Sequence, residues 1–163
     1  MAALEAEVQL LQSYGVDEID MVFNYHAYQN GQKDKALKQI AALVKWCPDQ
    51  CIKVILETGM FKEESTLYNA ALDVAALGVD FLKTSTGKVP VGATLPAARI
   101  LLEAIVASKK QLGLKVSGGV SSFEDAKAYY DLAKAHFVDV DSGCFRIGAS
   151  SLAKVLLHEK IQS

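Results

Sequence analysis

The sequence predicts an α/β fold in which five parallel strands alternate with helices. Short apolar runs, typical of buried strands, alternate along the 163 residues with segments whose apolar residues recur every three or four positions. No linker or low-complexity segment interrupts this pattern, so a single domain is expected over residues 1–163. The composition, 51% hydrophobic and 22% charged, is sufficient for a sizeable core.

The individual elements are predicted from apolar periodicity and from the residues that start and stop helices. The predicted strands are residues 18–24, 51–57, 80–84, 113–117 and 137–141. Amphipathic helices are predicted at 1–14, 33–47 and 63–77. Two further helices are expected to begin at Thr94-Leu95-Pro96, with proline in the first turn, and at Ser121-Ser122-Phe123-Glu124, which has capping-box spacing. Gly15, Gly78 and Gly113 are each expected to end a helix before the next strand.

Two architectures are compatible with this order of elements. Strand number and spacing alone favour an open, doubly wound sheet, because a complete (β/α)8 barrel, or TIM barrel, needs about 250 residues. Side-chain direction favours part of a barrel instead. Glu18 and Asp20 share one face of the first strand, and Lys53 and Glu57 share one face of the second, with apolar residues on the opposite faces. A barrel interior that holds an active site requires this arrangement, so we predict a partial TIM (β/α)8 barrel of five parallel strand–helix units.

Three lysines interrupt apolar, strand-like runs at matching positions: Lys53, Lys83 and Lys115. Burying an ammonium group is costly, and both desolvation and a second nearby cation favour the uncharged, nucleophilic amine. We interpret Lys83 as a Schiff-base nucleophile, Lys115 as the ammonium that lowers its pKa, and Asp20 as the acid–base group. Two alternatives remain open. The lysines could extend from the strand ends into solvent, and Asp20 could simply form a salt bridge with one of them.

Glycine-containing turns follow the last three predicted strands. Glycine lets the backbone approach a phosphate closely, and a helix that begins near Ser150 would offer free N–H groups. These turns therefore predict a phosphate site, although each could also be a tight connection. The turns are Ser85-Thr86-Gly87-Lys88, Ser117-Gly118-Gly119-Val120 and Arg146-Ile147-Gly148-Ala149-Ser150-Ser151.

Composition argues against several other classes of function. With a net charge of −2 and no basic block or cationic amphipathic helix, neither nucleic-acid nor membrane binding is expected. No apolar run reaches the roughly 18–20 residues that span a bilayer. Residues 1–14 do not look like a signal peptide, so a cytoplasmic location is expected. Cys47, Cys51 and Cys144 lack zinc-site spacing and are expected to be reduced packing residues, with no metal bound.

Together these motifs resemble those of the deoxyribose-phosphate aldolases, which are class I aldolases on an eight-fold strand–helix barrel. The run from Lys83 to Lys88 is the most specific part of the resemblance. Segments that resemble strands four to eight of the family lie, in order, at residues 15–20, 53–59, 80–88, 115–120 and 146–151. The resemblance implies reversible cleavage of 2-deoxy-D-ribose 5-phosphate to acetaldehyde and D-glyceraldehyde 3-phosphate in deoxyribose phosphate catabolism, without a metal or other cofactor.

The resemblance also implies roles for individual residues. Lys83 would be the Schiff-base lysine, Lys115 the neighbour that lowers its pKa, Asp20 the proton-transfer carboxylate, and Lys53 a supporting relay residue. Phosphate would be bound at the glycine-containing turns. The residues expected there are Thr86, Gly87, Lys88, Gly118, Gly119, Gly148, Ser150 and Ser151.

The chain departs from the family pattern in two ways. Many members carry arginine after the Gly-Gly-Val turn, where this chain has Ser121, so one phosphate-holding positive charge is missing. The first three strand–helix units also have no counterpart, so the expected partner is another copy or a separate N-terminal piece. Two rival interpretations remain: another Schiff-base barrel enzyme acting on a sugar phosphate, or a catalytically silent fragment with a role in assembly.

Overall fold

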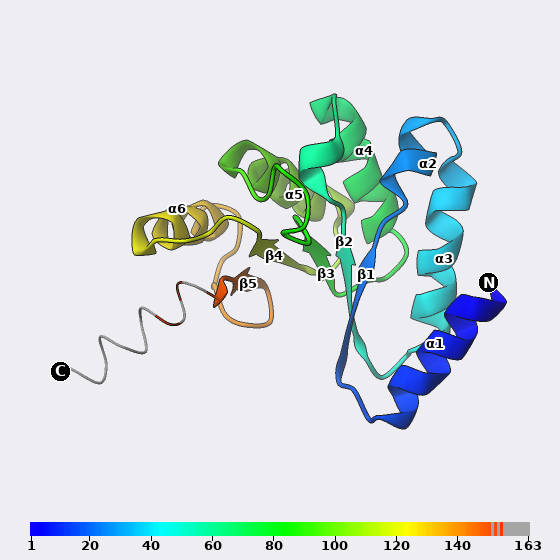
Figure 1. The fold of residues 1–163 in the computed structure, drawn as a ribbon. Helices are drawn as coiled ribbons and strands as arrows, with labels where there is room; N and C mark the ends of the chain where they lie inside the picture. Colours follow the sequence, from blue (N-terminus) through cyan, green and yellow to red (C-terminus); the bar gives the residue numbers. More distant parts are fainter. Residues whose placement is uncertain (151, 153, 155–163) are drawn as a thin grey trace.

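Five parallel strands form one sheet, and each strand pairs with the next one along the chain (Figure 1). The computed structural model describes residues 1–150, 152 and 154. The strands, in both sheet and chain order, are β1 (Glu18–Val22), β2 (Cys51–Ile55), β3 (Phe81–Lys83), β4 (Gly113–Ser117) and β5 (Phe145–Gly148). Pairing in chain order is typical of a barrel and differs from a doubly wound sheet, in which the strand order reverses.

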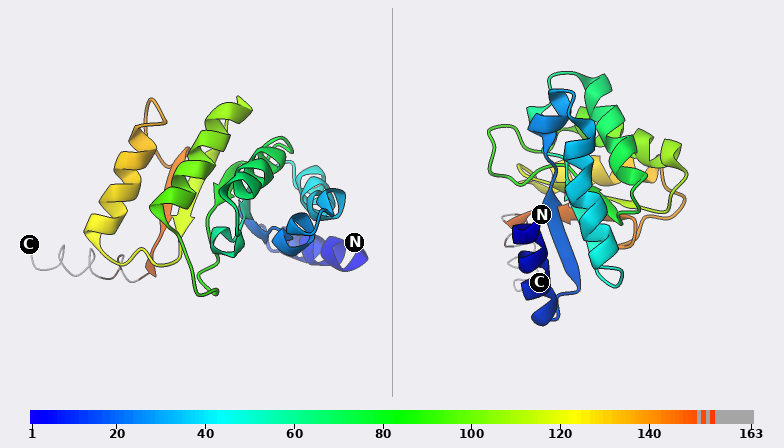
Figure 2. Two further views of the ribbon diagram at one scale, coloured as in Figure 1. Left: turned by 90° about the horizontal axis from the view of Figure 1, so that it is seen from above. Right: turned by 90° about the vertical axis from the view of Figure 1, so that its right-hand side faces the viewer.

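Helices connect the strands, and α3 to α6 form an arc along one side of the sheet (Figure 2, left). Within the described residues, no helix is both long enough and apolar enough to cross a lipid bilayer. The helical elements are α1 (Ala2–Ser13), α2 (Tyr25–Gln29), α3 (Lys33–Trp46), the 3-10 turn η1 (Thr58–Met60), α4 (Glu64–Ala75), α5 (Leu95–Ser108) and α6 (Phe123–Lys134).

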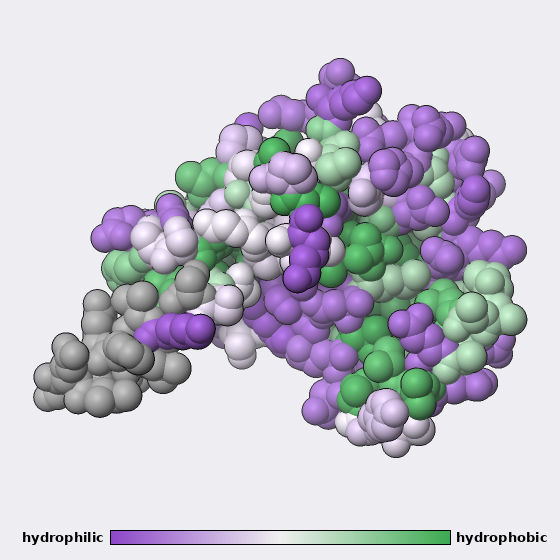
Figure 3. All heavy atoms as spheres, viewed as in Figure 1, coloured by the Kyte–Doolittle hydropathy of each residue, from purple (hydrophilic) through white to green (hydrophobic). Residues whose placement is uncertain are grey.

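The core lies between the helices and one face of the sheet. Ile52, Val54 and Leu56 alternate along β2 and its extension and are buried against the helices, as the period-two pattern predicted. Burying a side chain of this size contributes about 1.5–3 kcal/mol. The other face is polar, and hydrophilic side chains gather over the middle of the sheet in Figure 3. The sheet therefore separates a packed apolar layer from a face on which charged groups meet.

The fifth strand is not where the sequence pattern placed it. Residues 137–141 alternate between apolar and acidic but form no strand, and Val138 is fully exposed. The Asp141 carboxylate accepts hydrogen bonds from the N–H groups of Gly143 and Cys144 at 2.8 and 3.2 Å, which makes a turn. β5 follows that turn and pairs with β4. Arg146 was expected in a loop after the strand but is part of the strand itself.

Of the three glycines expected to end helices, two do so. Gly15 and Gly78 have φ values of +67° and +84° and lie two and three residues after the last residues of α1 and α4. Gly113 instead begins β4, and at the end of α5 it is Lys109 that adopts the left-handed conformation, with φ of 54°. A Cβ at Gly113 would lie 2.4 Å from the ring of Phe81, so close packing explains this glycine.

Side-chain caps fix the starts of two helices. The Thr94 hydroxyl accepts a hydrogen bond from the N–H of Ala97 at the start of α5, as expected from the proline in its first turn. The capping box of α6 joins Ser122 and Asp125, one residue later than predicted. β4 has the predicted bounds, and, the fifth strand apart, the other predicted strands and helices were longer than the observed ones by one or two residues at an end, because terminal residues turn out of the regular pattern.

Candidate active site

Three lysines from successive strands converge on one carboxylate. Asp20 Oδ1 accepts a hydrogen bond from Lys53 Nζ at 2.9 Å. Asp20 Oδ2 accepts from Lys83 Nζ at 2.6 Å and from Lys115 Nζ at 3.3 Å. The lysine side chains are 2%, 13% and 22% exposed, so none of them extends freely into solvent.

The register of the sheet explains this convergence. Asp20 lies opposite Lys53 in neighbouring strands, and Lys83 lies opposite Lys115. Residues opposite one another in a sheet point to the same face, so a single inward position in each strand is sufficient to bring the four groups together. The polar residues that interrupt each apolar run are therefore adjacent in space.

A second ion pair links the first and last strands of the sheet. Glu18 on β1 accepts hydrogen bonds from Lys53 at 2.7 Å and from Arg146 on β5 at 2.5 Å. The guanidinium of Arg146 also lies 4.4 Å above the ring of Phe81, a cation–π contact. Side chains from β1 and β5 can meet only because the sheet curves strongly, as part of a barrel does.

These contacts determine the charge states of the carboxylates. Hydrogen bonds from Lys53 and Arg146 lower the pKa of Glu18 to about 2. Burial acts to raise the pKa of Asp20, but hydrogen bonds from Lys83 and Lys53 outweigh it and hold that pKa well below the ordinary range. Burial acts to lower the pKa of Lys53, but its hydrogen bonds to Glu18 and Asp20 outweigh burial and raise that pKa. At neutral pH both acids are carboxylates and Lys53 is an ammonium.

Beside this cluster, a hollow of about 340 Å³ opens at the carboxyl ends of β3, β4 and β5, and we call it the carboxyl-end hollow. It brings Lys83 together with all three glycine-containing turns. Ser151, also expected there, lies outside the described residues. The lining residues are Lys83, Thr86, Gly87, Lys88, Ser117, Gly118, Gly119, Val120, Ser121, Gly148, Ala149 and Ser150.

The glycine turns around the carboxyl-end hollow also pack against one another. A Cβ at Gly118 would lie 3.3 Å from the Cα atoms of both Gly87 and Gly92, and its φ is +86°. The Gly118 carbonyl accepts a hydrogen bond from the N–H of Ala93 at 2.8 Å. Part of the glycine content therefore serves loop packing, a role that the sequence pattern alone could not separate from phosphate binding.

Comparison with known proteins matches this chain to one family. A family model described as DeoC/LacD family aldolase matches residues 1–158. The chain belongs to the DeoC/LacD aldolase family. It is also 40% identical over 161 residues to a deoxyribose-phosphate aldolase from Agrobacterium fabrum, which covers 97% of this chain and 62% of the relative. The aldolase-family chain thus spans less than two thirds of that relative's length.

Solved structures agree with the fold of this aldolase-family chain. The tetrameric deoxyribose phosphate aldolase of Aeropyrum pernix is 25% identical and superposes with a TM-score of 0.74, over 98% of this chain and 63% of that one. A structure from Toxoplasma gondii ME49 has a TM-score of 0.85 at 20% identity, over 96% and 63% of the two chains, which shows the fold alone. The prediction of a partial TIM barrel with five parallel strand–helix units is confirmed.

One residue of the aldolase-family chain at this site was given no role by the sequence reasoning. Glu57 is 2% exposed, and its carboxylate accepts hydrogen bonds from the backbone N–H and the hydroxyl of Thr86. The sequence placed Glu57 on the polar face of its strand and nothing more. An acidic residue that ends a buried apolar run is a usable signal, because a buried carboxylate needs partners.

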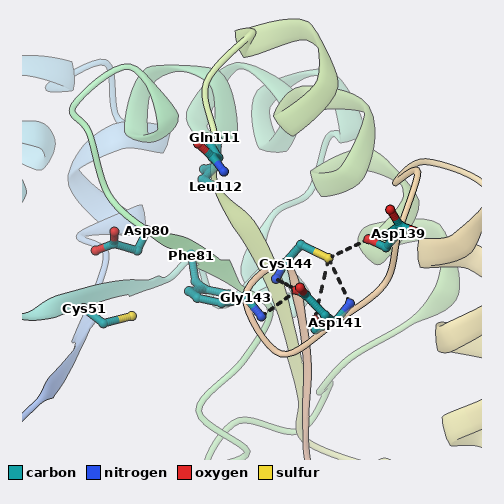
Figure 4. Close-up of a pocket in the computed structure, with 9 residues that line it drawn as sticks. All are labelled: Cys51, Asp80, Phe81, Gln111, Leu112, Asp139, Asp141, Gly143 and Cys144. Carbon is teal, nitrogen blue, oxygen red and sulfur yellow. Dashed lines mark hydrogen bonds between the residues drawn. The ribbon is translucent and has the colours of Figure 1, made fainter.

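A larger hollow, of about 560 Å³, lies at the amino ends of β2 to β5 (Figure 4), and we call it the amino-end hollow. Its lining includes Cys51 and Cys144, whereas Cys47 is buried in the core, and no disulfide joins the cysteines of the described residues. The lysine cluster contributes nothing to it. The lining residues are Cys51, Asp80, Phe81, Gln111, Leu112, Asp139, Asp141, Gly143 and Cys144.

Proposed function

We propose that this chain carries the Schiff-base and phosphate-binding machinery of a class I aldolase. The proposed reaction is the reversible cleavage of 2-deoxy-D-ribose 5-phosphate to acetaldehyde and D-glyceraldehyde 3-phosphate, in deoxyribose phosphate catabolism. One observation carries the proposal: two amines, Lys83 and Lys115, share a single carboxylate oxygen beside a hollow lined by glycine turns. The named relative and the family both support it.

Cations outnumber carboxylates around Lys83. Lys53 and Arg146 are both bound to Glu18, and Asp20 is contacted by all three lysines of the cluster. The proposed reaction needs Lys83 as an uncharged amine, and two ammonium groups that share one carboxylate repel each other. Lys83 lines the carboxyl-end hollow and Lys115 does not, so Lys83 is the amine placed to meet substrate.

In the proposed reaction, the uncharged amine of Lys83 adds to the aldehyde carbon of the open-chain sugar, and the carbinolamine loses water to give an imine. The bond between the second and third carbons then breaks. The hydroxyl on the third carbon gives up its proton and becomes the aldehyde of glyceraldehyde 3-phosphate, while the bonding pair forms an enamine on Lys83. Protonation of the enamine and addition of water release acetaldehyde and restore the amine.

Asp20 is the group proposed to move these protons. Its pKa is held well below the ordinary range, so Asp20 is a carboxylate at neutral pH, and it is proposed to pass protons directly or through a bound water. Its contact with Lys83 places it beside the reacting nitrogen. Lys53, bound to both Glu18 and Asp20, is proposed to orient the Asp20 carboxylate as a supporting relay residue.

The substrate phosphate is proposed to lie in the carboxyl-end hollow, against the turns at Gly87, Gly118, Gly119 and Gly148. Lys88 and the N–H groups of these turns would supply positive charge and hydrogen-bond donors. Ser121 also faces this hollow in place of the family arginine, and its hydroxyl and N–H lie 3.4 Å from the Asp125 carboxylate. Phosphate binding would then depend on backbone donors more than in relatives that carry the arginine.

The test is reductive trapping. Incubation of the chain with acetaldehyde and borohydride should leave a stable adduct at Lys83, located by peptide mass spectrometry. Lys83→Ala should abolish it, whereas Lys110→Ala, at an exposed lysine after α5, should not. An adduct that persists at another lysine in Lys83→Ala would contradict the assignment. Turnover of 2-deoxyribose 5-phosphate relative to other sugar phosphates separates this reaction from those of other Schiff-base barrels.

We also propose that the chain works as an assembly with further copies of itself. Strand β1 lies at the edge of the sheet, so its outer side has no strand neighbour within the described residues. Val22 on this strand is 46% exposed. The Aeropyrum pernix relative is tetrameric. The mass in solution, measured by light scattering after size exclusion, tests this: a monomer at micromolar concentration would contradict self-assembly.

A further inference from the structure

Glu57 occupies a backbone conformation that side chains other than glycine seldom adopt. Its φ and ψ are 55° and 57°, in the left-handed region. Among the described residues, the other non-glycine residue with positive φ is Lys109, which is exposed at the end of α5, where this conformation is common. Glu57 is buried and follows β2 directly. Strain at a buried charged residue near a candidate site points to a function for that residue.

The neighbours of Glu57 hold it in this conformation. The N–H of Leu56 donates to the carbonyl of Lys83 at 2.9 Å, and the N–H of Thr58 donates to the carbonyl of Thr84 at the same distance. Backbone pairing with the β3 segment therefore continues on both sides of Glu57. The left-handed turn between these two hydrogen bonds sends the Glu57 side chain toward the turn that follows β3.

The Glu57 carboxylate takes up both hydrogen-bond donors of Thr86. The Thr86 hydroxyl donates to Oε2 at 2.6 Å, and the Thr86 N–H donates to Oε1 at 3.1 Å. No lysine, arginine or histidine among the described residues forms a salt bridge with this buried carboxylate. These two bonds are therefore its main compensation for the loss of water.

The contact continues into the turn itself. The Thr86 hydroxyl donates a hydrogen bond to Glu57, and its oxygen accepts a hydrogen bond from the N–H of Lys88 at 3.1 Å. Gly87, held between these two residues, packs against Gly118, where a Cβ would come within 3.6 Å of the Gly118 Cα. A shift of Thr86 would therefore move Gly87 and Lys88, both of which line the carboxyl-end hollow.

We propose that Glu57 is a positioning residue for phosphate, which acts by clamping Thr86 so that the 85–88 turn holds its anion-binding shape. This inference rests on the proposed function, since it names what fixes the phosphate site of that reaction. It also reassigns Thr86. This residue was expected to bind phosphate, but its two donors are committed to Glu57, so it acts through the shape of the turn.

Phosphate binding to the full chain tests the clamp without reference to catalysis. Inorganic phosphate is titrated while the amide NMR signals of Gly87, Gly118 and Gly119 are followed. Glu57→Gly removes the carboxylate and supplies a residue that adopts positive φ readily. We expect it to weaken phosphate binding at least tenfold, while acetaldehyde trapping at Lys83 falls by much less. Glu103→Gln, an exposed glutamate on α5, serves as the matched control.

A double-mutant cycle distinguishes the clamp from general loosening of the fold. Thr86→Val removes the hydroxyl contact with Glu57 but keeps the N–H contact, so it should weaken phosphate binding, by no more than Glu57→Gly does. The double variant should bind no more weakly than Glu57→Gly alone, because the hydroxyl has no carboxylate partner left to lose. Thermal unfolding of each variant is measured alongside. If Glu57→Gly does not fold, Glu57→Gln retains one acceptor oxygen and should weaken binding several-fold.

Three results would overturn the inference: wild-type phosphate affinity in folded Glu57→Gly, fully additive losses in the double variant, or no phosphate binding at all by the unsubstituted chain. The fate of the Schiff-base proposal is read separately. A missing acetaldehyde adduct at Lys83, with phosphate bound and lost on substitution of Glu57, would count against the aldol chemistry and leave the clamp supported.

Discussion

The two hollows at opposite ends of the strands differ in what their polar groups are already doing. In the larger amino-end hollow, Asp80 accepts the N–H of Ile52 at 2.7 Å. Asp141, also in this hollow, accepts the N–H of Gly143 at 2.8 Å (Figure 4). These carboxylates stabilise strand starts and a turn. In the smaller carboxyl-end hollow, Lys83 is present, and among the described residues the N–H groups of Gly118 and Gly119 have no acceptor.

The presence of amines, rather than volume, separates the candidate site from the other hollow. At the amino-end hollow, the carboxylates of Asp80 and Asp141 accept backbone hydrogen bonds that stabilise the fold, and no amine side chain lines the hollow. The carboxyl-end hollow borders a cluster in which amines outnumber the carboxylate they share. Barrel enzymes place their chemistry at the carboxyl ends of the strands, which agrees with this difference.

The largest expected effect is at Lys83. Lys83→Met keeps the length of the side chain but removes the nucleophile, so retro-aldol turnover should fall at least about a thousandfold. Turnover is measured with 2-deoxyribose 5-phosphate in whatever assembly of the chain is active. Circular dichroism checks that the variant is folded. Turnover within tenfold of the unsubstituted protein would break the comparison, since the amine would then not be the reacting group.

Lys115→Met is expected to be the next most damaging. Lys115 shares Asp20 Oδ2 with Lys83, so the proposed mechanism loses one of its two paired amines, and turnover should fall about a hundredfold. The values of kcat and KM for 2-deoxyribose 5-phosphate provide the measurement, and circular dichroism checks that the variant is folded. Turnover within twofold of the unsubstituted protein would leave Lys115 without a role in the reaction.

Asp20→Asn should reduce stability by about 1–3 kcal/mol at pH 7, because Lys53, Lys83 and Lys115 lose their shared carboxylate. The sign of the pH dependence follows from the lowered pKa of Asp20. Its contribution is complete above the ordinary value of about 4 and disappears as pH falls through the lower folded value. The gap between the two proteins should therefore narrow on acidification. Urea unfolding at pH 7 and at steps down to pH 3 tests this.

The smallest effect is expected at the amino-end hollow. Gln111 lines this hollow, and its side chain forms no hydrogen bond with the described residues. We therefore expect Gln111→Ala to change turnover and phosphate affinity by less than about twofold. The same assays are used as for Lys83→Met. A tenfold loss of turnover in a variant of unchanged stability would assign the amino-end hollow a role in catalysis, and the two hollows would then not differ in function.

The local sequence pattern was sufficient to predict the lysine cluster, because each lysine is recognised from the apolar strand residues on either side of it. Lys53, Lys83 and Lys115 each interrupt a short apolar run, and period-two alternation with parallel pairing brings them together. The glycine turns were predicted for the same reason. Neither prediction needed knowledge of a distant partner in the chain.

The position of the fifth strand and the conformation of Glu57 are set by contacts with distant residues, which the local sequence pattern does not reveal. Residues 137–141 alternate as a strand does, yet 145–148 pairs with β4, and that choice is made by the partner strand. The conformation of Glu57 follows from pairing on both sides of it with the β3 segment. Tertiary contacts override local preference at these two places, and the second of them adjoins the candidate site.

The ion pair between Glu18 and Arg146 has a consequence for how the chain folds. The two residues are 128 positions apart, and every other strand of the sheet lies between them. The two side chains are brought within reach by the pairing of all the intervening strands, so the contact depends on the curvature of the complete sheet. Losing any one strand would separate the two charges, which couples the cohesion of the whole sheet to a single contact between its edges.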